Sequence, residues 1–524
     1  MSNKRAPEHK PLSFTTTLRN PARVAAFLDI LRNHDGEILT NELIHNVVKE
    51  LIQSRNYSTM YMKSKNSLKS VMLSEELQFT DAQLEEIVQN SPQKHKEAGF
   101  DKGWPSRFET WYRLCRELGF VYYEINQPIR ISPIGHSLCL AYGGLAEDED
   151  VSKTIQSVFL NCLAKYPSDN PFRRNANRNK PLILLMQVID LLREDKTQNG
   201  AGIARKEIPF VLCWPDSDSN SLYSFIKSFR ARYGYSASDD TVYEECLKLL
   251  RTDNTIRFKK SQIIVEYTDD FLRKVRITGA FATRGRGRFL DFNKFEIERI
   301  KYVLSTYADY REFASELEYF NYVGAMDERL IALESPVDIK QVEAIRAAKL
   351  SEVAAQYSER DIARELQILS SGRHSTDVYL SDIDEPTRLE FLTSIALLQR
   401  LQKATVAPNY AIDDEGNPTF TARGGIGDIE VSEGEIRALV EVTLMKNKDQ
   451  AVREVPGIRR HLDDVDADKK FAVLVAPSLH PDTKFMIEFT KYQYALDIVG
   501  YTIANFCEKI AESSGLEDLL QELI

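Results

Sequence analysis

Residues 427–443, with the sequence Gly-Asp-Ile-Glu-Val-Ser-Glu-Gly-Glu-Ile-Arg-Ala-Leu-Val-Glu-Val-Thr, predict a β-hairpin in the C-terminal part of the chain. A tight turn is expected at residues 433–434, where a glycine follows a glutamate. Because successive side chains of a strand point to opposite faces, Glu441 and Thr443 share one face while the neighbouring valines face the core. Asp428, near the start of the first strand, is therefore expected close to Glu441 at the open end of the hairpin.

Two carboxylates in this position can share a hard cation such as Mg²⁺, which takes oxygen ligands and keeps several waters. Such a cation polarises a phosphodiester oxygen and supplies a hydroxide nucleophile. The apolar run 471–477 further along predicts a buried strand. The alternative is a surface hairpin that carries these common residues by chance.

The segment between these strands, residues 449–461, contains further candidate site residues. If it is helical, Gln450 and Glu454 lie one turn apart and His461 lies two turns further on the same face. Pro456 either kinks this helix or marks the start of a new one. The alternative for the segment is a solvated, charged helix.

Upstream, a helix is predicted over residues 388–403, and Glu390 lies among its apolar neighbours. A buried glutamate needs a partner or a metal to be tolerated. Residues 293–370 contain little Gly or Pro and many charges, and they predict a helical connector.

The N-terminal half is predicted to be mostly helical. Residues 107–118 predict a helix that ends at Gly119, and residues 119–132 predict a strand, an Asn-Gln-Pro turn and a second strand. A helix followed by a hairpin is the winged form of a helix-turn-helix module. A second module of the same kind is predicted from helices at 181–192, 204–212 and 221–233, strand-like segments at 255–259 and 263–267, and a hairpin formed by 275–283 and 288–292.

Charge is distributed unevenly along the 524 residues, whose net charge is −10. Residues 1–290 carry a net charge of +7, and residues 291–524 carry −17. The net positive charge of the N-terminal part favours an anionic partner such as double-stranded DNA, and the net negative charge of the C-terminal part favours a site that needs carboxylates. Chance imbalance in a large protein is the alternative.

Composition excludes several classes of protein. With 43% hydrophobic and 28% charged residues, the chain is neither collagen, nor a coiled-coil rod, nor mostly disordered. No apolar stretch is long enough for a membrane span, and the polar N-terminus predicts no secretory signal. The six scattered cysteines predict reduced core thiols in a cytoplasmic protein that makes no membrane contact.

Basic residues at several places are candidates for DNA contact. The Gly-rich turn 284–288 carries three arginines, and residues 271–290 contain six Lys and Arg and no acidic residue. A solvated basic loop, or ordinary helix capping in the case of Asn20, is the alternative. The complete set of predicted DNA-binding residues is Arg19, Asn20, Arg107, Arg173, Arg174, Arg276, Arg284, Arg286 and Arg288.

The order and spacing of several segments resemble the AlwI-like type IIS restriction endonucleases, including the related nicking enzymes of the BstNBI kind. The resemblance runs over most of the chain. Its segments are 12–21, 119–135, 165–168, 276–285 with Asn293, 427–428, 441–443 and His461. It implies a site-reading region followed by a helical linker and a nuclease domain of the PD-(D/E)xK type.

The resemblance also implies roles for individual residues. It makes Asp428 and Glu441 ligands of Mg²⁺, for which Mn²⁺ can substitute, and Glu454 a third acidic ligand. Glu390 matches a glutamate of an active-site helix. Thr443 stands where the general motif has lysine, which makes Lys446 a candidate to orient the water. Glu430 is a candidate additional ligand, and His461 a supporting residue that acts through Glu454 or a phosphate.

We therefore predict an α+β multidomain protein with winged-helix-like DNA-reading modules at 1–150 and 151–292, a helical linker at 293–375 and an α/β nuclease domain at 376–524. It would bind a short asymmetric DNA sequence and hydrolyse phosphodiester bonds a few base pairs away. One nuclease domain per chain requires a transient second copy or a partner subunit for double-strand cleavage. The alternatives are a nicking endonuclease or another nuclease of this type, and a non-catalytic sequence-specific DNA-binding protein.

Overall fold

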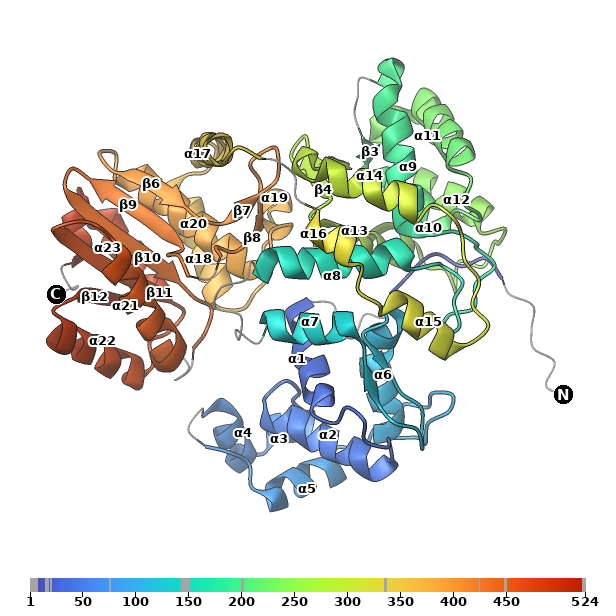
Figure 1. Ribbon diagram of the computed structural model, residues 1–524, viewed down its shortest axis with the longest axis horizontal. Helices are drawn as coiled ribbons and strands as arrows, with labels where there is room; N and C mark the ends of the chain where they lie inside the picture. Colours follow the sequence, from blue (N-terminus) through green and yellow to red (C-terminus); the bar gives the residue numbers. More distant parts are fainter. Residues whose placement is uncertain are drawn as a thin grey trace. The chain divides into compact units, whose positions relative to one another are not determined.

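The computed structural model describes residues 8–14, 18, 21–74, 77–142, 151–198, 202–333, 337–423, 425–446 and 450–520 (Figure 1). The chain forms two compact units. Unit 1 comprises Met1–Ala146 and Lys153–Ser335, and unit 2 comprises Glu147–Ser152 and Pro336–Ile524. Both are built from helices and β-sheet, and the acidic run at 147–150 lies outside the described residues. None of the described helices has the length and apolar character that crossing a membrane requires.

The first part of unit 1 is mostly helical. Its elements are α1 (Pro21–Arg32), α2 (Asn41–Gln53), α3 (Met60–Ser64), α4 (Asn66–Leu73), α5 (Asp81–Gln89), α6 (Trp104–Glu117), β1 (Val121–Tyr122), β2 (Arg130–Ile131), α7 (Pro133–Tyr142) and α8 (Val151–Lys165). The predicted helix and hairpin around Gly119 are confirmed, because β1 and β2 pair antiparallel directly after α6. Gly119 has φ +73°, and a Cβ there would lie 2.9 Å from atoms of Val323 and Gly324, so only glycine fits this helix end.

The second part of unit 1 contains α9 (Pro181–Glu194), β3 (Ile203–Ala204), α10 (Ile208–Cys213), α11 (Ser219–Tyr233), α12 (Asp239–Leu249), π-helix η4 (Ser261–Tyr267), α13 (Thr268–Arg276), β4 (Phe281–Arg284) and β5 (Phe289–Phe292). Strands β3, β5 and β4 form a small antiparallel sheet in that order. The hairpin around residues 284–288 is thus confirmed, although its first strand begins at Phe281 because α13 extends to Arg276.

Two strands predicted in this part are wrong. Residues 263–267 belong to the π-helix, and residues 255–259 form turns. Alternation over five residues does not distinguish a strand from a helix that continues into the next segment. Here the chain runs directly into α13, and the Thr268 hydroxyl donates to the Ile263 carbonyl at 3.0 Å. The helix predicted at 204–212 likewise begins only at Ile208, after the short strand β3.

The predicted helical character of residues 293–370 is confirmed in the described residues. Unit 1 contains α14 (Ile297–Thr306), α15 (Glu316–Val323) and α16 (Glu328–Ala332), and unit 2 contains α17 (Ile339–Ala354), α18 (Glu359–Ser370) and α19 (Val378–Ser381). The division into four domains, with boundaries after residues 150, 292 and 375, and the winged-helix assignment stay predictions.

Unit 2 is built around a mixed five-stranded sheet with the order β12-β11-β10-β9-β6. Its strands are β6 (Thr405–Pro408), β9 (Ile429–Glu433), β10 (Ile436–Val442), β11 (Lys469–Ala476) and β12 (Asp497–Thr502). Strands β6, β9 and β10 pair antiparallel, whereas β10, β11 and β12 pair parallel. The predicted hairpin and the predicted buried strand are therefore confirmed as β9–β10 and β11. A separate two-stranded ribbon pairs β7 (Ala411–Ile412) with β8 (Pro418–Phe420).

Helices cover both faces of this sheet (Figure 1). One layer contains α18, α20 (Glu385–Arg400) and α23 (Ile503–Glu512), and the other contains α21 (Val455–Asp464) and α22 (Pro481–Tyr494). Leu439 of β10 packs with Ile458 and Leu462 of α21 in a buried cluster. The helices thereby hold the sheet rigidly, and the predicted site residues lie at the end of its central hairpin.

Candidate active site

Asp428 and Glu441 lie side by side at the end of the β9–β10 hairpin. The Val442 N–H donates to Asp428 Oδ2 at 2.8 Å, which fixes this carboxylate beside the last residues of β10. The charge of Glu441 acts directly on the Asp428 carboxyl group, so the two groups form one electrostatic pair. Glu441 lies in β10, and Asp428 directly precedes the first residue of β9, so the hairpin register sets their separation.

The two carboxyl groups resist ionisation together. Burial raises the pKa of Asp428 well above its usual range, and the neighbouring Glu441 charge raises it further. Burial also raises the pKa of Glu441 to about 7. Like charges held close together in a desolvated site disfavour the state in which both are ionised.

Glu390 approaches the same site from helix α20, in one of the two helical layers. Its carboxylate is buried, and the Ala422 N–H donates to its Oε2 at 2.9 Å. Burial, followed by the Asp428 charge, raises the Glu390 pKa well above its usual range. The partner that a buried glutamate requires is thus a backbone amide, and the carboxyl group belongs to the same electrostatic cluster as Asp428.

Glu454 and His461 come from the opposite side of the hairpin. Glu454 ends the π-helix η6 (Gln450–Glu454), and α21 begins at the next residue with Pro456 in its first turn, so the proline marks a helix start. Burial raises the Glu454 pKa, and a hydrogen bond with the Thr443 side chain opposes the shift. His461 Nδ1 lies 2.8 Å from Glu441 Oε1. The structure therefore brings His461 to Glu441, whereas the sequence prediction joined it to Glu454 or a phosphate.

Glycine at position 427 allows the hairpin to close tightly over Glu441. A Cβ at this position would lie 3.3 Å from Glu441 Oε1 and 3.1 Å from Leu439 Cδ2. Asn409 holds the same segment from the other side: its side-chain amide donates to the Gly427 carbonyl at 2.8 Å, and its N–H donates to the Asp428 carbonyl at 2.9 Å. Sequence reasoning did not identify Asn409, because a single asparagine after a strand carries no distinctive signal.

Three other candidates do not belong to this cluster. Gln450 is fully buried and bonded within the scaffold: its amide donates to the Met445 and Ser478 carbonyls at 2.7 and 2.9 Å. Lys446 is exposed and donates to the Ser370 carbonyl at 3.1 Å. Glu430 is exposed and accepts from the Asn409 amide at 3.2 Å. Gln450 and Lys446 therefore have partners away from the Asp428–Glu441 pair, and Glu430 accepts from the Asn409 amide that also holds the Gly427 carbonyl.

The donor chemistry fits a hard divalent cation. Four carboxyl groups gather here, and within the described residues none of them forms an ion pair with Lys or Arg. No group of three or more His, Cys, Asp or Glu in the described part of the chain is already arranged as a metal cage. A site of two carboxylates completed by waters is the arrangement that Mg²⁺ commonly takes.

The three arginines of the β4–β5 turn differ in their surroundings. Arg284 is half-buried, and its guanidinium donates to the Phe292 carbonyl at 2.8 Å within its own hairpin. Arg286 and Arg288 are exposed, and Arg286 adopts φ +58° between two glycines that also have positive φ. The turn therefore presents two arginines to solvent while the third stabilises it.

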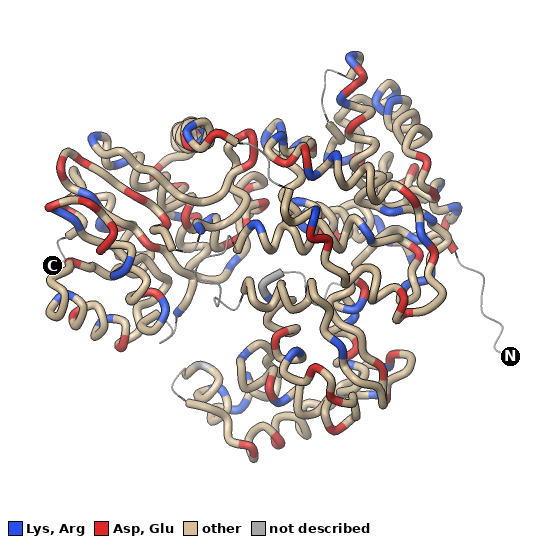
Figure 2. The backbone as a smooth tube through the Cα atoms, in the orientation of Figure 1, with Lys and Arg blue, Asp and Glu red and all other residues tan. Residues whose placement is uncertain are grey.

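The other predicted DNA-binding residues also differ in their exposure and in the contacts that they make. Arg107 stacks on the Tyr57 and Trp111 rings and contacts His95, which makes it a packing residue. Arg174 is exposed and Arg276 is half-buried. Arg19 and Asn20 lie outside the described residues. Positive and negative residues are interspersed along the helices of unit 1, so its positive charge does not form one continuous stripe (Figure 2).

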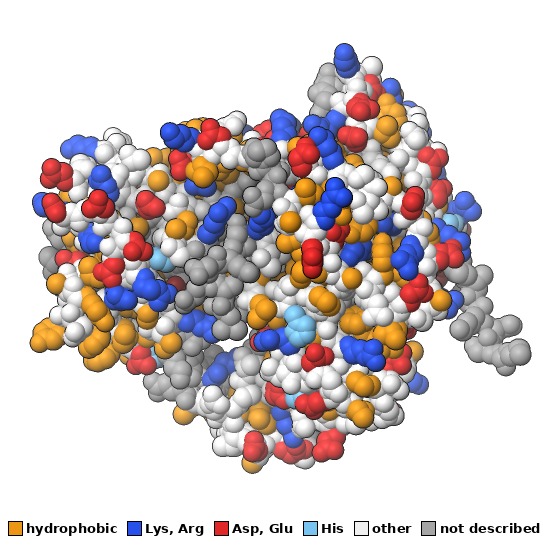
Figure 3. Space-filling model, viewed as in Figure 1, with side chains coloured by type: hydrophobic (Ala, Val, Ile, Leu, Met, Phe, Trp, Pro, Cys, Tyr) orange, Lys and Arg blue, Asp and Glu red, His pale blue; other side chains and the backbone are white. Residues whose placement is uncertain are grey.

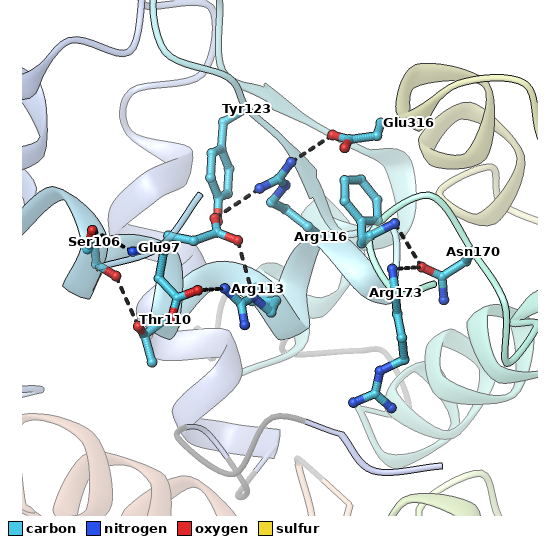
Figure 4. Close-up of polar contacts among 11 residues, drawn as sticks. Glu97, Ser106, Thr110, Arg113, Arg116, Tyr123, Asn170, Arg173 and Glu316 are labelled. Carbon is cyan, nitrogen blue, oxygen red and sulfur yellow. Dashed lines mark hydrogen bonds and ion pairs between the residues drawn. The ribbon is translucent and has the colours of Figure 1, made fainter. Parts of the chain in front are cut away.

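Arg173 belongs to a polar network inside unit 1 (Figure 4). Its backbone N–H donates to Asn170 Oδ1 at 3.0 Å, and its guanidinium donates to the Ser13 hydroxyl at 3.1 Å. Nearby, Arg116 joins Glu109 and Glu316 at 2.9 and 2.8 Å. These arginines hold segments of unit 1 together, which leaves little of Arg173 available for phosphate contact.

Comparison with known proteins gives one family match. The model of the AlwI restriction endonuclease family matches residues 116–371 and 329–508. No curated protein matches the chain. Among solved structures, the small subunit R.BspD6I2 of the heterodimeric restriction endonuclease R.BspD6I is 19% identical, with 29% of this chain and 77% of that chain covered and a TM-score of 0.25. Restriction endonuclease FokI, alone and bound to DNA, is 12% identical with 98% of each chain covered and a TM-score of 0.24.

Proposed function

Because the chain belongs to the AlwI restriction endonuclease family, we propose that it is a type IIS enzyme that reads a short asymmetric sequence in double-stranded DNA and cuts a few base pairs away. Unit 1, with its winged-helix-like modules, reads the sequence, and unit 2 hydrolyses the phosphodiester bond. The observation that carries this proposal is the cluster of four carboxyl groups at the β9–β10 hairpin, whose pKa values are all raised. Such perturbed groups are typical of functional sites.

Asp428 and Glu441 are the residues that would hold a divalent cation, with Glu454 close by. Mg²⁺ in this position, or Mn²⁺ in its place, would polarise a phosphodiester oxygen and lower the pKa of a water. The cost of ionising Asp428 and Glu441 together makes this pair a strong attractor for positive charge. Neutral side chains at these positions would remove the attraction while leaving the fold intact.

The surrounding residues orient this pair. His461 Nδ1, 2.8 Å from Glu441 Oε1, limits the rotation of that carboxylate. The Thr443 side chain, at the position where the general motif has lysine, bonds Glu454 and would orient that carboxyl group in the same way. Burial raises the pKa of Glu390, so this side chain binds a proton more readily than an exposed glutamate and would thereby reduce the negative charge beside Asp428. We therefore propose that His461 and Glu390 position and tune the Asp428–Glu441 pair.

Arg286 and Arg288 are the arginines we propose for DNA contact, because they are exposed in the turn between β4 and β5. Exposed arginines in such a turn suit phosphate contact or groove entry. One nuclease site per chain cuts one strand, so a double-strand break needs a second copy or a partner subunit. A protein that acts alone would be a nicking endonuclease.

The test is to incubate plasmid DNA with the protein and Mg²⁺ and to map the ends. Site-specific cleavage at a fixed offset from one sequence is expected, and EDTA should abolish it. Asp428→Asn should still bind the site without cutting it, whereas Asp468→Asn, an exposed aspartate directly before β11, should cut normally. Sequence-specific binding with no cleavage by the wild type would instead identify a non-catalytic DNA-binding protein.

A further inference from the structure

Arg346 is a positively charged residue of unit 2 that lies beside the cluster of four carboxyl groups without joining it. It belongs to α17, and its Nη1 donates to the Pro408 carbonyl at 2.7 Å. Pro408 is the last residue of β6 and pairs with Ile429, the first residue of β9. The next residue, Asn409, donates from its N–H to the Asp428 carbonyl at 2.9 Å. The guanidinium is therefore bonded to the chain one residue before the asparagine that holds Asp428.

No acidic side chain in the described part of the molecule neutralises this guanidinium. Arg346 forms no ion pair there, and its buried Nε has no hydrogen-bond acceptor. Burial lowers the Arg346 pKa, and the nearby Tyr410 hydroxyl and Glu343 carboxylate oppose the shift. The positive charge of Arg423 lowers this pKa further. A guanidinium that is partly removed from water and unpaired costs free energy, and an anion bound beside it would offset that cost.

Tyr410 contacts the arginine on one side and the helix of Glu390 on the other. Its side chain is fully buried, and the Arg346 guanidinium lies 5.9 Å from its ring centroid. On α20 the ring of Phe391, the residue after Glu390, has its centroid 5.7 Å from that of Tyr410. The charges of Arg346 and Glu390 both act on the Tyr410 hydroxyl. The arginine and the carboxyl cluster thus approach the same tyrosine instead of pairing with each other.

The anion that fits this place is a phosphate of the DNA backbone. The carboxyl groups of the site repel a polyanion, and a divalent cation would offset this repulsion only where it is bound. On the face that Figure 3 shows, Lys and Arg side chains are interspersed with Asp and Glu, so no large area of positive charge is visible there. Arginine suits the task, because its planar guanidinium stays charged and donates to phosphate oxygens. Arg423, exposed between β8 and Asp428, adds a second positive charge.

We propose that Arg346, with Arg423 beside it, binds a backbone phosphate of the cut strand next to the scissile one, an inference that rests on the proposed nuclease function. Arg346 is then a substrate-positioning residue. Its bond to the Pro408 carbonyl fixes it relative to Asp428, so the bound strand is held at a set distance from the metal ligands. Small displacements of reacting atoms slow a chemical step strongly. Helix α17 thus contributes to the active site, although it lies in the segment that the sequence predicted as a linker.

The experiment combines a variant protein with DNA that lacks one phosphate charge. Duplexes of the cleaved sequence carry a single uncharged methylphosphonate linkage, moved outward from the scissile bond, and single-turnover cleavage with Mg²⁺ is measured. We expect one linkage next to the scissile bond to slow the wild type roughly tenfold. Arg346→Gln should be about tenfold slower on unmodified DNA and should show no further slowing at that linkage. A purely structural defect would slow all duplexes alike and leave the response to that linkage intact.

Lys340→Gln is the matched control, because Lys340 is exposed on the same helix and the substitution removes the same charge. It should keep the wild-type rate and the wild-type response to every linkage. Arg423→Gln changes an exposed side chain and should weaken the response at the same linkage, which keeps the test available if Arg346→Gln does not fold.

Three results would overturn the inference while leaving the nuclease function standing, because in each of them the wild type still cuts. One is cleavage of unmodified DNA by Arg346→Gln at the wild-type rate. Another is a methylphosphonate effect that stays undiminished in Arg346→Gln at every linkage. The third, if Arg346→Gln does not fold, is a full wild-type response in Arg423→Gln. A wild type that cuts no DNA with Mg²⁺ overturns the proposed function and this inference together.

Discussion

Replacing Glu441 with glutamine should stabilise unit 2 while abolishing cleavage. Glutamine keeps the size of the side chain and an oxygen that can face His461 Nδ1, but it cannot ionise. In the folded protein burial raises the Glu441 pKa from 4.5 to about 7. The folded state therefore holds this proton more strongly than the unfolded state, and stability is lost as the pH rises through this range.

The size of the effect follows from the shift. At pH 8 ionising Glu441 costs the folded state about 3 kcal/mol relative to the unfolded chain, at about 1.4 kcal/mol for each pH unit of difference. At pH 5 the carboxyl group is still protonated in the folded state, and the cost is below about 1 kcal/mol. Glu441→Gln should therefore raise the free energy of unfolding of unit 2 by up to about 3 kcal/mol at pH 8 and by much less at pH 5.

The measurement must report on unit 2 specifically. All three tryptophans, at positions 104, 111 and 214, lie in unit 1, so intrinsic fluorescence follows the wrong unit. Native-state hydrogen exchange of peptides from β11, with EDTA present, follows the sheet next to Glu441. Glu435→Gln, at the exposed turn of the same hairpin, should leave this exchange unchanged. Equal protection in wild type and Glu441→Gln at pH 8, or an equal gain at pH 5 and pH 8, would refute the electrostatic reasoning.

Further predictions concern cation binding and DNA contact. Mg²⁺ should raise the melting temperature of unit 2 more at pH 8 than at pH 5.5, because protons compete with the cation for Glu441 below about pH 7. Thermal unfolding with Mg²⁺ and with EDTA at each pH measures this difference. An equal rise in melting temperature at both pH values would contradict the prediction. Arg286→Ala and Arg288→Ala should each weaken DNA binding and lower its salt dependence by roughly one counterion, as measured by fluorescence anisotropy at several salt concentrations. If the Arg286→Ala protein binds DNA as tightly as wild type, this turn does not contact DNA. Arg284→Ala should instead destabilise the β4–β5 hairpin, because it loses the hydrogen bond to the Phe292 carbonyl.

Elements with strong local patterns could be predicted from the sequence. The β9–β10 hairpin, the buried strand β11 and the helix that ends at Gly119 each combine periodicity with a residue that fixes a turn or a helix end. The gathering of Asp428 and Glu441 follows from the hairpin register alone. Glu390 could be proposed because a carboxyl group among apolar neighbours needs an explanation, but only the tertiary fold brings α20 to the hairpin.

Other features depended on interactions that no local pattern contains. The π-helix at residues 261–267 alternates like a strand and is helical because it continues into α13. Gln450 and Glu454 lie in one π-helical turn, yet the hydrogen bonds of Gln450 are used within the scaffold. Arg284 and Arg286 are the same type of residue in one turn, but Arg284 is half-buried and Arg286 is exposed in the folded hairpin. In each case the conformation or exposure of the residue depends on contacts with residues distant in the sequence, or on the backbone conformation at one position.

The close approach of Gly427 to the Glu441 carboxylate has a consequence for the variation that this protein can tolerate. A methyl group at position 427 meets the movable ends of two side chains, Leu439 and Glu441, so the hairpin can still form while the carboxylate is displaced. At Gly434 nothing lies within 4 Å of an added Cβ, although its φ of +59° still favours glycine or asparagine. Under selection for cleavage, position 427 should therefore remain glycine in every surviving clone, whereas position 434 should drift to asparagine at little cost.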